Sequence, residues 1–95
     1  MPRKEGIMIE YNGISFGVKN WVWEQGDLEL MRVLIDRLIE TLDPEEIARK
    51  AKMSSDDVFI FAIIFEHTGS EVFVHVIYYN GNCETWVDVK GMSEL

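Results

Sequence analysis

Two Asn-Gly pairs, Asn12-Gly13 and Asn80-Gly81, each stand between runs of alternating apolar residues. Both central residues of a type I′ turn need positive φ, which Asn and Gly tolerate best, so each pair predicts a tight β-hairpin. In the first hairpin, the expected partners are Tyr11 with Ile14, Ile9 with Phe16 and Ile7 with Val18. All six then fall on one face, so the turn and the apolar pattern indicate the same register.

A helical periodicity separates the two hairpins. Between residues 28 and 42, apolar side chains recur at intervals of three and four residues, which predicts an amphipathic helix with Asp27 as its N-cap. Asp43 and Pro44 predict a second, short helix, because Asp is a preferred cap and Pro suits the first helical turn.

Residues 58–89 predict a three-stranded meander. Segments 58–66, 72–79 and 83–89 are rich in β-branched and aromatic residues and are separated by turn residues. The predicted order is therefore ββααβββ. Because strands and helices are segregated along the chain, we expect one α+β domain over residues 1–95, with an antiparallel sheet of about five strands and two helices packed mainly on one face.

The turns also predict which side chains of the meander share a face. A two-residue loop at 80–81 pairs His75 with Trp86, and the preceding turn pairs Phe61 with Val76. The face expected to meet the helices holds Phe59, Phe61, Ile63, Phe65, Val72, Val74, Val76, Tyr78, Val87 and Val89. The opposite face holds Val58, Ile60, Ala62, Ile64, Phe73, Ile77, Tyr79 and Trp86, with His75, Glu84 and Asp88 among them.

Both predicted faces of the meander are thus apolar, whereas an antiparallel sheet usually presents one polar face to water. Burying one large apolar side chain is worth about 1.5–3 kcal/mol. If several such side chains stay in water, the burial free energy that is lost is comparable with the stability of a whole domain, about 5–15 kcal/mol. The sequence leaves three alternatives for what packs against the second face: a helix of the same chain, a second copy of the chain, or a different protein.

The charge is strongly negative and uneven. The net charge is −8, and residues 54–95 contribute seven carboxylates against Lys90 alone. Such a field repels nucleic acid and anionic membranes and attracts basic surfaces. One cysteine, Cys83, cannot form an internal disulfide, and the longest apolar run, residues 58–65, is too short to span a bilayer. We therefore expect a cytoplasmic protein without a membrane segment.

Residues 45–58 resemble a helix-turn-helix in the spacing of Ile47-Ala48, Met53 and Val58. The resemblance covers fourteen residues and implies DNA binding through a second helix that begins near Ser54. That helix would begin with Ser-Ser-Asp-Asp, which is acidic where a duplex would be met, and would continue into a segment that favours strand. DNA binding is accordingly the least favoured function, and we expect no direct contact with nucleic acid.

Catalytic and metal-binding signals are weak. A zinc site needs three or four converging ligands, and His67 and His75 with nearby acids do not guarantee such a convergence. Cys83 has no assigned cation or histidine beside it, which favours a structural thiol over a nucleophile. We expect no cofactor, no metal and no enzymatic activity.

The favoured function is a non-catalytic acidic protein-binding module. Its size and charge are typical of inhibitors such as immunity proteins and phage anti-defence proteins, whose carboxylates attract a basic nuclease or nucleic-acid-binding partner. A homodimeric adaptor joined through the second sheet face is the alternative. The candidate contacts are Ile60, Phe73, His75, Ile77, Tyr79, Glu84, Trp86 and Asp88. Trp21 and Trp23 are secondary candidates because they have the opposite parity to the core-facing residues of the first hairpin.

Overall fold

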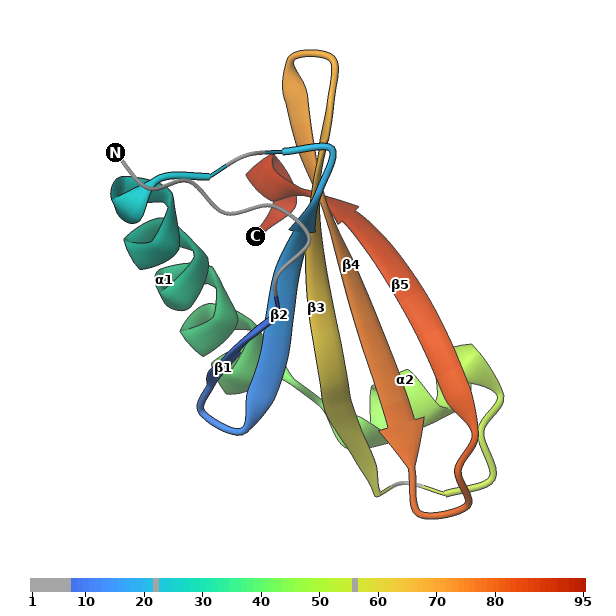
Figure 1. Cartoon of the computed structure of the whole chain (residues 1–95). Coiled ribbons are helices and arrows are strands. Elements are labelled where there is room, and N and C mark those ends of the chain that lie inside the picture. The colour runs from blue at the N-terminus through green and yellow to red at the C-terminus, as the bar shows by residue number, and fades with distance from the viewer. Residues whose placement is uncertain (1–7, 22, 56) are drawn as a thin grey trace.

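The computed structural model describes residues 8–21, 23–55 and 57–95 of the chain. The strands are β1 (Ile9–Tyr11), β2 (Ile14–Lys19), β3 (Val58–Thr68), β4 (Glu71–Asn80) and β5 (Thr85–Gly91). The helices are α1 (Gln25–Thr41), α2 (Pro44–Ala51) and the short 3₁₀ turn η1 (Met92–Glu94). The five strands form one sheet in the order β1-β2-β3-β4-β5 (Figure 1).

The expected α+β fold is confirmed, with one parallel pair in an otherwise antiparallel sheet. Strands β2 and β3 run parallel, with Phe16 beside Ile63 and Val18 beside Phe65. The chain passes through α1 and α2 between these two strands, and such a crossover returns it in the same direction. The buried residues of both helices join the sheet in a single core, so both helices pack on one face (Figure 1).

The first hairpin has the predicted turn and register. Asn12 and Gly13 both have positive φ, at 53° and 77°, as a type I′ turn requires. Tyr11 pairs with Ile14 and Ile9 pairs with Phe16. The predicted pairing of Ile7 with Val18 lies outside the described residues.

Helix α1 begins earlier than the sequence predicts, because Asp27 acts within the first turn rather than as the cap. Glu24 is the N-cap, and the Asp27 carboxylate accepts a hydrogen bond from its backbone N–H at 3.0 Å. Helix α2 begins as predicted, since Asp43 accepts hydrogen bonds from Glu45 N–H and Glu46 N–H at 3.2 and 3.4 Å.

Residues 54, 55 and 57 after α2 are irregular, and β3 follows directly. The second helix of a helix-turn-helix is therefore absent from the described part of this segment. Lys52 ends α2 in the left-handed conformation, with φ of 57°, at the position where that motif usually has glycine.

The two secondary candidates of the first hairpin do not lie on an outward face. Strand β2 ends at Lys19, and Asn20 then turns the chain with φ of 56°. Trp23 is buried in the core, and Trp21 packs beside His67 with ring centroids 5.6 Å apart. The parity argument fails because the strand does not continue past Asn20.

Strand β3 contains a β-bulge that the sequence does not reveal. Ile60 pairs with Tyr78 but Ala62 pairs with Ile77, so Phe61 is the extra residue. A bulge shifts the alternation by one residue, which brings both Ile60 and Ile63 to the helix side. The predicted pairing of Phe61 with Val76 is wrong.

The predicted two-residue loop between β4 and β5 is also wrong. Tyr79 pairs with Thr85, and the Asn80 N–H donates to the Glu84 carbonyl at 3.2 Å, which leaves a three-residue loop. Cys83 closes this loop in the left-handed conformation, with φ of 61°. Such loops combine a type I turn with one left-handed residue.

The Asn80 side chain explains the longer loop. It is almost fully buried, and its oxygen accepts hydrogen bonds from the N–H groups of Asn82 and Glu84, both at 3.0 Å. Asn80 therefore precedes the turn as its anchor, instead of occupying the turn with Gly81. This changes the register of β5 by an odd number of residues, so every β5 side chain changes face.

Candidate protein-interaction surface

One face of the sheet carries no helix, and its side chains are mostly apolar. We call it the open face. The strand pairings place Phe59 beside Tyr79, Ile64 beside His75 and Ile77 beside Val87 on this side. The apolar residues of the open face are Phe59, Phe61, Ile64, Phe73, Ile77, Tyr79, Val87 and Val89, and the same pairings place Glu10, Lys19, Glu66, Glu71 and His75 on this side.

The most exposed part of the open face is an aromatic cluster at one end of the sheet. Phe61 is 59% exposed, Phe59 45% and Tyr79 37%. Tyr79 stands between the two phenylalanines, with ring centroids 5.6 Å from each. Val87 and Val89, both half-exposed, continue the apolar surface on β5 beside Ile77 and His75. Single exposed apolar side chains are ordinary, whereas contiguous exposed apolar groups are typical of interaction surfaces.

Four of the eight predicted contact residues lie on the open face. Phe73, His75, Ile77 and Tyr79 alternate along β4, and all four are at least partly accessible. The parity of β4 is as predicted because the two-residue β3–β4 turn, now at Gly69-Ser70, shifts the register by an even number of residues. Whether these four side chains bind a partner stays a prediction.

Two further members of the eight, both apolar, face the helices instead. The bulge at Phe61 turns Ile60 into the core. The longer loop pairs Trp86 with Tyr78, and the two rings stack with centroids 5.7 Å apart. Burial of Tyr78, with a further contribution from Asp88, raises its pKa to about 12, which is consistent with an enclosed position on the helix side.

The two predicted carboxylate contacts also lie elsewhere. Asp88 alternates with the open-face valines and therefore lies on the helix side, where its carboxylate is 3.1 Å from the Lys90 ammonium. Glu84 is in the β4–β5 loop. Its carboxylate accepts hydrogen bonds from the Asn80 side chain at 2.9 Å and from the Ser54 hydroxyl and N–H at 2.6 and 3.1 Å. These bonds, led by that from Asn80, lower the pKa of Glu84 to about 2.

Sequence reasoning misses four residues of the open face: Phe59, Phe61, Val87 and Val89. It assigns them to the helix side because it assumes that side chains alternate without interruption along β3 and that a two-residue turn joins β4 to β5. The turn error has a signal in the sequence, since Asn and Asp can anchor a turn from the preceding position as well as occupy it. The bulge has none, because β3 is apolar at successive positions and shows no alternation to interrupt.

The centre of the open face carries little charge. His75 Nε2 lies 2.7 Å from Glu66 Oε1, and both side chains are partly buried. The second oxygen of Glu66 lies 3.8 Å from the Lys19 ammonium and 3.4 Å from the Asn20 amide nitrogen. The exposed carboxylate of Glu71 lies beside the β3–β4 turn, at one end of the sheet. The acidity of the chain therefore lies mainly away from the apolar cluster.

An apolar notch of about 310 Å³ adjoins the aromatic cluster. It lies where β3 extends beyond the β1–β2 turn, since β2 pairs with β3 only from Ala62 onward. Its lining comprises Asn12, Gly13, Ile14, Ile39, Leu42, Phe59, Ile60 and Tyr79. Phe59 and Tyr79 thus belong both to the notch and to the open face.

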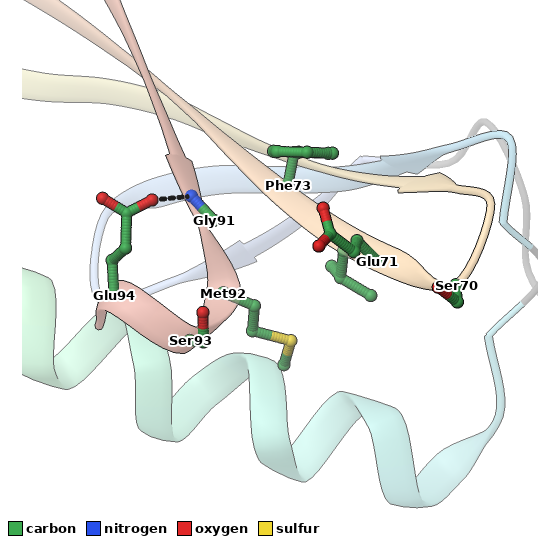
Figure 2. A pocket seen from close by; sticks show the side chains of 8 residues that line it. Ser70, Glu71, Phe73, Gly91, Met92, Ser93 and Glu94 are labelled. Carbon is green, nitrogen blue, oxygen red and sulfur yellow. Dashed lines mark hydrogen bonds between the residues drawn. The ribbon is translucent and has the colours of Figure 1, made fainter.

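A larger cavity of about 550 Å³ lies between the start of β4 and η1 (Figure 2). Met92 points toward α1 and Phe73 points away from it, while the Glu94 carboxylate accepts a hydrogen bond from the Gly91 N–H at 2.7 Å. The described lining contains two carboxylates and two serine hydroxyls but no histidine or thiol.

The described ranges 8–21, 23–55 and 57–95 contain no group of three or more His, Cys, Asp or Glu side chains placed to hold a metal ion. No helix within them has the length and apolar content to cross a membrane.

Comparison of the chain with protein-family models, with curated proteins and with solved structures found no match.

Proposed function

We propose that the chain is a non-catalytic protein-binding module and that the open face is its binding surface. The observation that carries the proposal is the set of exposed large apolar side chains on a sheet face that neither helix covers. Aromatic side chains such as Phe61 and Tyr79 are the types that most often anchor interfaces. They would supply the contact area, and the partly buried polar pair of His75 and Glu66 would fix orientation.

The charge supports a partner with a basic surface, as in inhibitors or antagonists of nucleases and other nucleic-acid-binding proteins. A net charge of −8 would speed the encounter with such a partner and make binding sensitive to salt. Because Glu84 and Asp88 lie off the open face, this attraction would come from the field of the whole molecule rather than from carboxylates within the contact.

The test uses a photo-crosslinking residue placed at Phe61 and, as a matched control, at Val33. Val33 is 52% exposed on α1, away from the sheet. We expect efficient crosslinks to a protein from position 61 and background levels from position 33. Equal crosslinking from both positions, or none from position 61, contradicts the proposal. The mass of the crosslinked product reports whether the partner is another copy of this chain or a different protein.

A homodimeric adaptor is the second candidate. The observation that favours it is the weak charge at the centre of the open face, because two copies of an acidic chain can approach closely only through a surface that carries little charge.

A further inference from the structure

We propose that a second copy of this chain occupies the open face, so that the protein is a two-fold symmetric dimer with its two sheets packed face to face. This proposal rests on the open face being the binding surface, and it takes the second candidate, the homodimer, in place of a different partner with a basic surface. Each copy would contribute one layer of helices and one layer of sheet. The dimer would then have four layers, with the two sheets at the centre and the helices outside.

The exposed apolar area is of the size that such a dimer needs. Taking about 200 Å² for a whole aromatic side chain, the exposed fractions of Phe59, Phe61 and Tyr79 leave roughly 280 Å² in water. Val87, Val89 and the partly exposed Ile64, Phe73 and Ile77 add to it. A stable interface buries roughly 800 Å² on each partner, of which a little over half is apolar. The open face alone supplies most of that apolar share.

The distribution of charge also suits a second copy. Like charges placed opposite each other across an interface are strongly unfavourable. On the open face, Glu66 is held by His75 and lies near Lys19, Glu71 stands at the β3–β4 turn, and the exposed Glu10 lies on the edge strand β1. The remaining cluster is uncharged, so two copies can meet there while their acidic surfaces stay apart.

The shape of the surface is compatible with self-recognition. A two-fold interface must be complementary to itself, so that each protruding group finds a recess on the other copy. Phe61 protrudes from the bulge and is the most exposed aromatic side chain of the face. The apolar notch bounded by Phe59 and Tyr79 is the adjacent recess. We therefore assign Phe61 as the principal anchor of the dimer.

The test is sedimentation equilibrium of the whole chain, from submicromolar to submillimolar concentration, at low and high salt. The wild-type chain should sediment with twice its monomer mass of 11.0 kDa. Phe61→Asp and Val89→Asp should each raise the dimer dissociation constant at least ~30-fold, as expected for interface anchors. Val33→Asp is the matched control, since Val33 and Val89 are both 52% exposed. It should leave the dissociation constant unchanged.

Circular dichroism of each variant confirms that it is folded, so that a loss of association reports the interface. A wild-type chain that stays monomeric at every concentration overturns the dimer, as does a dimer that survives both Phe61→Asp and Val89→Asp. If a monomeric chain still crosslinks to a different protein from position 61, the proposed function stands and only the second copy is refuted. If it is monomeric and does not crosslink, both proposals fail.

Discussion

Replacing Asn80 with alanine tests how the β4–β5 loop sets the faces of the sheet. The Asn80 side chain is 1% exposed and makes three hydrogen bonds. Two are accepted from backbone N–H groups and one is donated to Glu84. At a net 0.5–1.5 kcal/mol for each bond, Asn80→Ala should lower the free energy of unfolding by about 2–4 kcal/mol. That is a large part of the roughly 5–15 kcal/mol that holds a domain folded.

Urea unfolding followed by circular dichroism measures this loss. Asn82→Ala is the matched control, because the exposed Asn82 side chain makes one hydrogen bond, to the Ser54 hydroxyl at 2.8 Å. It should cost no more than about 0.5 kcal/mol, as is usual for surface positions. A cost for Asn80→Ala below about 0.5 kcal/mol, or one equal to that of Asn82→Ala, would refute the account of how this loop fixes the register of β5.

Three further predictions concern the same end of the sheet and its core side. Hydrogen bonds lower the pKa of Glu84 from 4.5 to about 2, so its ionised form stabilises the fold fully above pH 4.5, and this contribution fades as the pH falls toward 2. Glu84→Gln should therefore have a melting temperature that changes less with pH in that window than that of the wild type; equal slopes would contradict this. Burial raises the pKa of Tyr78 from 10.0 to about 12, so an ultraviolet titration should show a tyrosine that ionises near pH 12 and that disappears in Tyr78→Phe. Folded-state stability should also decline as the pH rises above 10, where the unfolded chain releases this proton first. Cys83→Gly should raise the free energy of unfolding by up to about 1 kcal/mol in urea melts, because Cys83 has φ of 61° and glycine adopts that conformation without strain; a loss of stability would show that the thiol makes an important contact.

The sequence is sufficient for the parts of the fold that local chemistry determines. The Asn12-Gly13 turn sets the first hairpin because both residues adopt positive φ, and Asp43 with Pro44 starts α2 because each suits a helix N-terminus. The order of elements follows from their separate patterns. The expectation of an apolar second sheet face also agrees with the structure, and of the three alternatives left open by the sequence, the structure excludes a covering helix of the same chain.

Local sequence patterns do not show which residues lie on that face. Alternation is read from one residue to the next, so a single bulge at Phe61 and one extra loop residue after Asn80 reverse the assignment of every side chain beyond them. The apolar runs in β3 and β5 hide both changes, since either parity places apolar residues on each face. The parallel pairing of β2 with β3 is equally invisible, because it depends on where the chain returns after two helices.

A methyl NOESY spectrum of the valine side chains shows whether the helices leave the open face bare, because it reports what lies against β5. The account predicts contacts from the Val87 methyls to the Ile77 side chain and from the Val89 methyls to the His75 ring, which are their neighbours on β4 across the open face. In a sample that mixes labelled and unlabelled chains, it also predicts contacts from these methyls to a second molecule. Contacts from Val89 to Leu34 or Leu38 of α1 in the same chain would contradict it, because the helices would then cover this face and no open surface would remain for a partner.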